Sequence, residues 1–391
     1  MEQKKPLLRD KNIHVIFGIT LSAVMGVSSI APALPSIARS LDISTDQIGL
    51  LITVFTLPGI FLTPVLGILA DRFGRKRILI PSLMLFGVAG VLCGFSTNFT
   101  QLLWLRFFQG FGAAALGTLN VTLIGDLYKG NRRATAMGYN GSVLSVGTAA
   151  YPAVGGALAM LGWNYPFFLS VIAIPVGLYA AIALKPIPLQ NSTSLKTYFG
   201  NIFTALRKPL VLGLFASIFL TFFILYGGYI TFFPILLDEK YGVSPLFIGL
   251  LLSSTSIITG LTSLQLGWLT RRFAEQGLML IGAILYFLIF LVIPSIENIW
   301  MLLIPIFFFG VAQGLNIPSI LNLLTGQVPS DYRAAFLSVN WMVIRCGQTI
   351  SPYLLGIAYV MFGVNGTFYV TSVAAGLFIL LAFWLYKNSG K

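Results

Sequence analysis

The sequence has few charged residues. Asp, Glu, Lys and Arg make up 9% of its 391 residues, whereas a soluble domain carries about 25%. That share is too small to cover a water-soluble body of this size, so most of the surface must face lipid. One histidine, two cysteines and scattered carboxylates offer neither a metal site nor a nucleophile–base pair, which argues against an enzyme. No Gly-x4-Gly-Lys-Ser/Thr run is present either, which argues against an ATP-driven pump.

Hydrophobic residues, by contrast, make up 57% of the chain and occur in long runs. A helix needs about 20 apolar residues to cross a hydrocarbon core. Twelve runs are this long, so the sequence predicts an all-α integral membrane protein with twelve transmembrane helices. The predicted spans are 13–34, 47–70, 78–96, 99–125, 134–160, 164–184, 210–237, 245–270, 277–295, 299–324, 334–361 and 366–386.

The net charge of +13 follows the predicted topology. Most Lys and Arg residues lie at the two termini and in every second loop, and only Arg39 and Lys240 lie in the alternate loops. Because positive charge is enriched in cytoplasmic loops, this predicts a multi-pass protein of the cell membrane with both termini in the cytoplasm. The charge therefore needs no nucleic-acid partner. We expect membrane lipids and a small-molecule substrate as partners, a monomer, and no cofactor.

The chain repeats itself at an offset of 200 residues. Gly67, Arg72, Arg133, Asn140, Gly147, Pro152 and Gly156 recur as Gly267, Arg272, Arg333, Asn340, Gly347, Pro352 and Gly356. The repeat predicts two pseudo-symmetric six-helix bundles, 1–184 and 209–391, an arrangement found in transporters with their site between the halves. The connection, 185–208, has the apolar spacing of an amphipathic surface helix, although its first part, 186–194, equally fits a flexible linker.

Three motifs resemble a known family. The run Gly67-Ile-Leu-Ala-Asp71-Arg72-Phe-Gly74-Arg75-Lys-Arg, after the second span, resembles the signature loop of the major facilitator superfamily. The run from Arg106 to Gly112 resembles the fourth-helix motif of that family. The run from Gly138 to Gly156 is similar to the fifth-helix signature of its twelve-helix drug and metabolite exporters, the drug:H+ antiporter type, except that Tyr151 stands where the pattern has glycine.

The resemblance implies a conformational or coupling role for residues at these motifs. It places Asp71 in a charge network with Arg72, Asp126 and Arg133 that latches the outward-open state; surface ion pairs of little energetic weight are the alternative. The residues concerned are Asp71, Arg72, Gly74, Arg75, Asp126, Arg133, Gly147, Pro152, Gly155 and Gly156.

Polar residues inside the predicted spans are candidates for a substrate cavity, because such groups are costly in a membrane. The cations in the spans are Arg106 and Arg345. Arg345 lies near the midplane on one helix face with Trp341 and Gln348, and is the strongest candidate; a structural Arg satisfied by backbone carbonyls is the alternative. The full set is Arg345, Trp341, Gln348, Asn340, Arg106, Gln109, Asn120, Tyr226, Tyr229, Gln313, Asn316 and Tyr151.

No Asp or Glu lies deep in a predicted span, whereas many proton-coupled drug exporters of the resembled family carry a buried carboxylate there. This weakens the case for a cationic drug and favours neutral or anionic substrates. We therefore predict a secondary transporter that exports small amphipathic organic molecules by alternating access. Proton coupling stays open, with Asp71, Asp126 and Asp46 as the candidate carboxylates. The alternative is a transporter or flippase for an anionic metabolite or a lipid-linked head group, organised around Arg345 and Arg106.

Overall fold

The structure is a computed structural model that describes residues 6–184, 208–327 and 333–388, without the side chains of 333–338. The predicted linker helix and the side chain of Arg333 therefore lie outside the described residues. The first half contains η1 (Leu7–Arg9), α1 (Lys11–Ser28), η2 (Ala31–Ala33), α2 (Leu34–Ser40), α3 (Thr45–Ile48), α4 (Leu50–Phe73), α5 (Arg75–Cys93), α6 (Phe99–Leu127), α7 (Gly130–Ala159), α8 (Tyr165–Phe168), η3 (Leu169–Ile172) and α9 (Ala173–Ala183). The second contains α11 (Pro209–Phe223), η4 (Ile224–Phe232), α12 (Phe233–Tyr241), α13 (Pro245–Leu269), α14 (Glu275–Val292), η5 (Ile293–Ser295), η6 (Ile299–Leu302), α15 (Leu303–Gly326) and α16 (Arg333–Asn388).

The predicted all-helical membrane fold is confirmed. Eleven helical segments of the described chain are long and apolar enough to cross a membrane, and the last of them runs from Val339 to Asn388. Gly363 interrupts that segment with φ 69° and ψ −174°, a backbone conformation that is not helical. The segment therefore consists of two spans, which brings the observed number into line with the twelve predicted.

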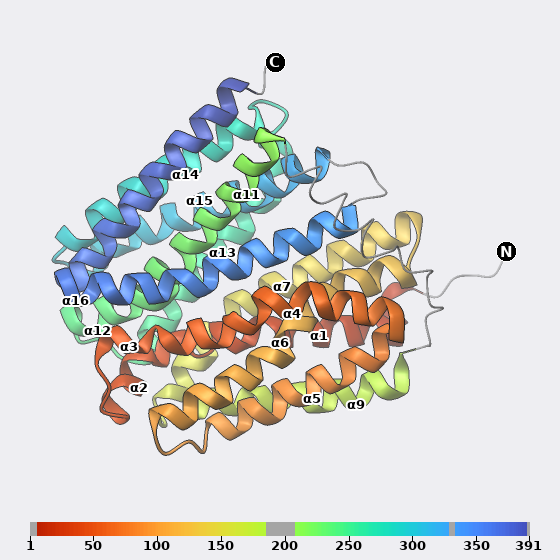
Figure 1. Ribbon diagram of the computed structural model, residues 1–391. Coiled ribbons are helices and arrows are strands. Elements are labelled where there is room, and N and C mark those ends of the chain that lie inside the picture. The colour runs from red at the N-terminus through yellow and green to blue at the C-terminus, as the bar shows by residue number, and fades with distance from the viewer. Residues whose placement is uncertain (1–5, 185–207, 328–332, 389–391) are drawn as a thin grey trace.

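The two halves repeat the same internal contacts at the 200-residue offset. Thr63 on α4 donates to the Ala114 carbonyl on α6 at 3.1 Å, and Ser263 on α13 donates to the Gly314 carbonyl on α15 at 3.4 Å. In Figure 1 the two sets of helices lie as two bundles, with α16, α4 and α7 where they meet. Positions that differ by 200 can therefore be compared as structural counterparts.

The halves also meet through close backbone contacts. Gly49 at the start of α4 faces the Pro352 carbonyl, and Gly356 on α16 faces the Asp46 carbonyl. A Cβ atom on these glycines would lie 2.7 and 2.6 Å from the two oxygens. Because the helices touch main chain to main chain here, this end of the molecule, called the closed end below, is sealed.

Polar contacts between the halves are also concentrated toward the closed end. Arg39 on α2 pairs with Asp238 on α12, and Ala153 on α7 donates its amide proton to Ser253 on α13 at 3.0 Å. Deeper in the protein, Ser145 on α7 lies 4.0 Å from a Cβ built on Gly260 of α13.

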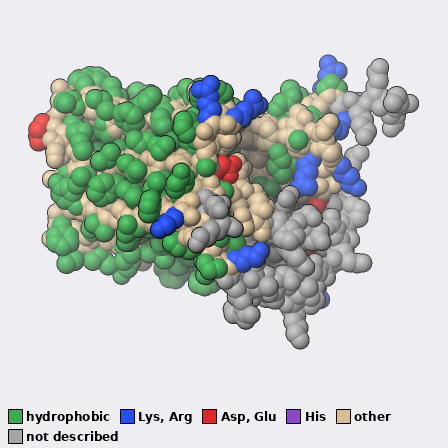
Figure 2. Space-filling view, turned by 90° about the horizontal axis from the view of Figure 1, so that it is seen from above, with side chains coloured by type: hydrophobic (Ala, Val, Ile, Leu, Met, Phe, Trp, Pro, Cys, Tyr) green, Lys and Arg blue, Asp and Glu red, His purple; other side chains and the backbone are tan. Residues whose placement is uncertain are grey.

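Beyond Ser145 the halves diverge. Gly138 and Gly141 on α7 and Gly267 on α13 have no atom within 4 Å of a Cβ placed on them. Basic side chains gather toward this end, called the basic end below, whereas the rest of the face in Figure 2 is mainly hydrophobic. The structure is thus closed at one end and open at the basic end.

Candidate substrate site between the halves

Arg345 lies on α16 at the interface between the halves. Its side chain packs on α4, where a Cβ on Gly59 would lie 2.9 Å from both its Cδ and Nε atoms. Within the described chain it makes one hydrogen bond, from Nη1 to Gln348 Oε1 at 3.0 Å, and it remains partly exposed. A guanidinium carries five N–H donors. Most of its donor capacity is therefore unused by the protein.

Residues one helical turn to either side of Arg345 also face the first half. Thr349 donates to Thr56 Oγ1 at 2.8 Å and accepts at its carbonyl from Thr53 at 2.9 Å, so α16 and α4 are bridged on the closed-end side. Trp341 lies on the basic-end side, 3.4 Å from a Cβ built on Gly117 of α6. Arg345 thus lies immediately on the basic-end side of the sealed part of the interface.

A π-helical segment continues α11 next to this site. η4 spans Ile224–Phe232 and holds both predicted tyrosines. Tyr226 lies near enough to interact with the Arg345 guanidinium and the Gln348 side chain. Tyr229 is buried, stacks on Phe309 with ring centroids 4.1 Å apart, and shares a hydrogen bond with Thr255. Since π-helical turns are rare and frequently occur at functional sites, the two tyrosines of this segment join Arg345 as candidates.

Arg106, the other membrane-embedded cation, has a different environment. It has no exposed surface, and it donates to the Gly26 carbonyl at 2.9 Å, the Leu51 carbonyl at 3.3 Å and Gln109 Oε1 at 2.7 Å. Its guanidinium also lies 4.1 Å from the centroid of the Phe55 ring. These contacts tie α1, α4 and α6 together inside the first half. Gln109 Nε2 donates to Ser170 Oγ at 2.9 Å, which extends the network to η3, the segment before α9.

The remaining polar candidates fall into separate groups. Asn120 on α6 bonds to Thr20 on α1, which in turn bonds to Asn140 on α7, inside the first half. Asn340 is buried on α16 near Trp341 in sequence, with no partner found for its Oδ1 atom among the described residues. Gln313 and Asn316 are buried within the second half. Only part of the predicted set therefore meets at the interface with Arg345.

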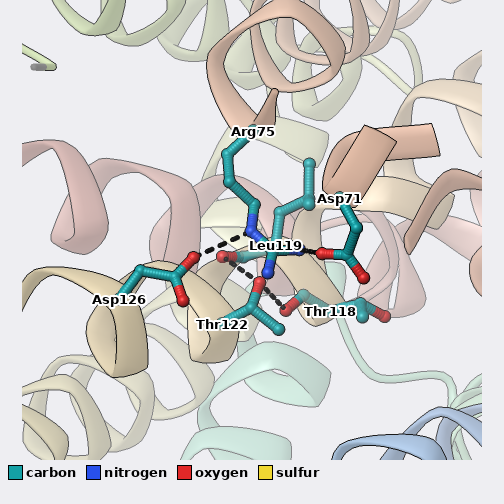
Figure 3. A network of polar contacts seen from close by, with 6 residues as sticks. All are labelled: Asp71, Arg75, Thr118, Leu119, Thr122 and Asp126. Carbon is teal, nitrogen blue, oxygen red and sulfur yellow. Dashed lines mark hydrogen bonds and ion pairs between the residues drawn. The ribbon is translucent and has the colours of Figure 1, made fainter. Parts of the chain in front are cut away.

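The charge network at the basic end contains two members of the network that the resemblance implied, Asp71 and Asp126, but neither of its arginines. Arg75, at the start of α5, pairs with Asp71 at 2.5 Å and with Asp126 on α6 at 2.9 Å, as Figure 3 shows. Arg72 instead lies exposed against the Phe73 ring, because it points to a different side of the end of α4. Arg133 is exposed and lies beside Gly125.

Gly74 makes this network possible, because its φ of 98° lets the chain turn between α4 and α5. The three charged partners belong to α4, α5 and α6, all in the first half. The network therefore links helices within one bundle in the state observed.

The glycines of the fifth-helix motif allow close contacts at the closed end. Gly155 packs on the Ser29 carbonyl of the first half, and Gly156 packs on the Pro245 carbonyl of the second. Pro152 presents its own carbonyl to Gly249 of α13. Gly147 faces Leu21 on α1, and Tyr151 is partly buried one turn away. The motif thus joins α7 to both halves.

Gly59, which the sequence did not single out, completes the site as the surface on which Arg345 rests, and Gly117 is the surface on which Trp341 rests. A glycine in a membrane helix has no functional group that would mark it as part of a site. The sequence offered one indication, which is that the two halves differ at this position, with Gly59 in the first and Thr259 in the second. Within the described residues, no group of three His, Cys, Asp or Glu side chains is placed to hold a metal ion.

Two six-helix membrane bundles related by an internal repeat, with polar groups at their interface, define a transporter architecture. The sequence comparison gives the family: the Major Facilitator Superfamily model matches residues 16–239 and 215–391, and the chain belongs to that family. The fold and family are those of transporters, which are not enzymes.

Curated relatives and solved structures agree with this assignment. The chain is 27% identical over 296 residues to Multidrug resistance protein 2 of Bacillus subtilis (strain 168), covering 73% of this chain and 74% of the relative. It is 25% identical to the Bacillibactin exporter of the same organism, over 88% of each chain. Its fold is similar, with a TM-score of 0.80 and 19% identity over 96% of each chain, to a bacterial homologue of the human lysosomal transporter Spinster, solved in an inward-facing and occupied conformation.

Proposed function

We propose that this protein exports amphipathic organic molecules that carry an anionic group, and that Arg345 binds that group. The observation that carries the proposal is the contrast between the two membrane-embedded arginines. Among the described residues, Arg106 is fully buried and has three protein acceptors, whereas Arg345 is partly exposed at the interface and has one. A guanidinium in a membrane is costly unless it is paired, so Arg345 is available for a partner that the chain itself does not supply.

An anion is the partner that suits this geometry. A guanidinium holds a carboxylate or phosphate through two parallel charge-assisted hydrogen bonds, which are about twice as strong as neutral ones. Tyr226, Gln348 and the Trp341 ring would contact the remainder of the ligand, since polar groups set among aromatics suit an amphipathic molecule.

Alternating access follows from how the halves touch. In the observed state the interface is sealed on one side of Arg345, whereas α7 and α13 diverge toward the basic end. Transport would require the closed-end contacts, including Arg39–Asp238 and the bridges of Thr349, to separate while the basic end closes.

We assign the basic end to the cytoplasm because positive charge is enriched on that side of a membrane, and we propose that both termini of this cell-membrane protein lie there. A molecule would then enter from the cytoplasm and leave outside. The names of the two Bacillus subtilis relatives, a multidrug resistance protein and an exporter, support this direction. We propose a monomer surrounded by lipid as the working unit.

A proton gradient is the energy source we propose, with the Asp71–Arg75–Asp126 network as its site. Protonation of either carboxylate would remove one of the two ion pairs of Arg75 and loosen the junction of α4, α5 and α6. No cofactor is required for this scheme.

Binding to purified protein tests the proposal. 2-Naphthoate and its uncharged isostere 2-naphthamide would be titrated against wild type, Arg345→Gln and Arg345→Lys, with Arg77→Gln, an exposed arginine of α5, as the control. A charge-assisted hydrogen bond contributes about 1.5–3 kcal/mol, so Arg345→Gln should weaken naphthoate binding about 10- to 150-fold. It should leave naphthamide binding unchanged, and Arg345→Lys should retain an intermediate affinity for naphthoate. Equal effects on both compounds would contradict anion recognition by Arg345.

A further inference from the structure

The second half contains a buried polar cluster that the site at Arg345 does not use. It is formed by Gln313, Asn316 and Ser319 on α15 and by Tyr286 on α14, all at most 3% exposed. Tyr286 and Asn316 interact with each other, whereas among the described residues no hydrogen-bond partner is found for either polar atom of Gln313 or for Ser319 Oγ.

These groups lie close together near the middle of their helices. Gln313, Asn316 and Ser319 follow one another at single-turn spacing along one flank of α15. Asn316 lies against Gly282 of α14, with its Nδ2 atom 2.5 Å from a Cβ built there, and Tyr286 is one turn further along α14 and interacts with it. The cluster therefore offers two carboxamides and two hydroxyls from two adjacent helices.

The six-helix fold does not require polar groups at these positions. Their counterparts in the first half, at the 200-residue offset, are the buried apolar residues Phe86, Ala113, Leu116 and Leu119. The first half packs the same helix pair with side chains that need no partners. A buried polar group without a hydrogen bond destabilises a protein, and more so at membrane depth. Gln313 and Ser319, for which the described residues supply no partner, therefore call for a ligand or water.

Aromatic residues connect this cluster to the interface between the halves. Tyr226 of η4 faces Arg345, and Tyr229 of the same π-helical segment stacks on Phe309. Phe309 in turn lies 5.4 Å from the Tyr286 ring, centroid to centroid. Two stacked rings, Tyr229 of η4 and Phe309 of α15, thus connect the π-helical segment beside Arg345 to Tyr286 of the cluster.

We infer that Gln313, Asn316, Ser319 and Tyr286 form a second subsite, for an uncharged hydrogen-bonding group, such as a phenolic hydroxyl or an amide, on an aromatic part of the transported molecule. The inference rests on the proposed function, which supplies the route to the subsite. Carboxamides and hydroxyls both donate and accept, so they suit a neutral partner, and the cluster contains no charged residue that would select a charged one. Water occupies the subsite when no substrate is bound.

The experiment compares ligands that differ by one hydroxyl. Binding of 6-hydroxy-2-naphthoate and 2-naphthoate, and of the uncharged pair 2-naphthol and naphthalene, would be measured by calorimetry on the purified full chain. The double variant Tyr286→Phe/Asn316→Leu introduces the residues that the first half carries at these positions. Asn322→Leu, an exposed asparagine on the same helix, is the matched control.

Wild type and the control should bind the hydroxylated member of each pair at least about tenfold more tightly, because an unmade buried hydrogen bond is costly. The double variant should lose that preference while its affinity for the unhydroxylated compounds stays within about twofold. Tyr286→Phe alone, which removes one oxygen atom and keeps the ring, should lose part of the preference.

Three results would overturn the subsite. The first is a hydroxyl preference that persists in the double variant, and the second is a wild type without a preference in either pair. The third is a double variant that melts at a much lower temperature and loses affinity for all four compounds. The last result would show a structural, water-filled network instead. The uncharged pair separates this inference from the proposed function, because Arg345→Gln should weaken only the anionic pair. If the uncharged pair keeps its preference while neither anion binds, anion recognition fails and the subsite stands.

Discussion

Adding one methyl group at the closed end should shift the protein toward its other conformational state. Gly356 on α16 faces the Asp46 carbonyl of the first half, and a Cβ on Gly356 would lie 2.6 Å from that oxygen. Ordinary van der Waals contact begins at 3.4 Å, so Gly356→Ala requires the two main chains to separate by about 0.8 Å.

The separation has a calculable effect on the populations of the two states. Overpacking of this kind costs about 1–3 kcal/mol, and the strain acts only while the closed end is sealed. The equilibrium should therefore move about 5- to 150-fold toward the state that is open at the closed end. Gly376→Ala, in the span that follows Gly363, adds the same methyl and the same helix propensity, but its Cβ would lie 3.7 Å from the nearest atom and should shift nothing.

Pulsed electron paramagnetic resonance would measure the shift. Spin labels on cysteines at Arg77 and Arg271, both exposed at the basic end and one in each half, report how far apart the halves are there. In a background without Cys93 and Cys346, wild type and Gly376→Ala should show a long distance, and Gly356→Ala should gain a shorter one. An unchanged distance distribution in Gly356→Ala, or the same change in both variants, would refute the assigned role of the closed-end glycines.

Three further predictions concern stability. Arg106→Met should lower the free energy of unfolding by about 2–5 kcal/mol, because it leaves Gln109 and two backbone carbonyls without their donor. The variant should keep the wild-type ratio of naphthoate to naphthamide affinity. A thermal melt and a titration measure the two quantities, and a lost ratio with an unchanged melting temperature would contradict the structural role of Arg106. Gly74→Ala should cost about 1–2 kcal/mol because its φ is 98°, whereas Gly138→Ala, with a normal φ and no close neighbour, should cost nothing in the same melts. Tyr128 lies between α6 and α7, where burial and its hydrogen bond to Asp10 raise the pKa of the phenol, so Tyr128→Phe should cost about 1 kcal/mol at both pH 6 and pH 9. The contribution belongs to the protonated phenol and is lost only above the ordinary tyrosine pKa, so a cost that disappears by pH 9 would contradict this.

The helices could be predicted from the sequence because their signal is local. Runs of apolar residues have to be about 20 residues long to cross the bilayer, and the break between the last two spans was expected between 361 and 366, where the structure has Gly363. The turn at Gly74 was likewise visible as a glycine between a carboxylate and a basic cluster.

The partners of the polar residues could not be predicted in the same way. Arg106 and Arg345 look alike in sequence, as single cations in apolar helices, and differ only in how many acceptors the neighbouring helices bring to them. Arg75 rather than Arg72 bridges Asp71 and Asp126, because the direction of each side chain is set by the turn between α4 and α5. An α-helix and a π-helix do not differ in composition, so η4 could not be predicted. Tyr226 and Tyr229 would share one face of an ideal α-helix, but in η4 Tyr226 lies near Arg345 and Tyr229 stacks on Phe309.

Transport of a labelled anion tests the central claim most directly. Wild type, Arg345→Gln and Arg77→Gln would be reconstituted into liposomes, and the uptake of radiolabelled 2-naphthoate and 2-naphthamide would be followed with and without a pH gradient. We predict that wild type and Arg77→Gln carry naphthoate and that Arg345→Gln loses at least nine-tenths of this flux, by about a tenfold or greater loss of binding, with naphthamide flux unaltered. Naphthoate transport by Arg345→Gln at the wild-type rate would contradict the claim that Arg345 recognises the substrate.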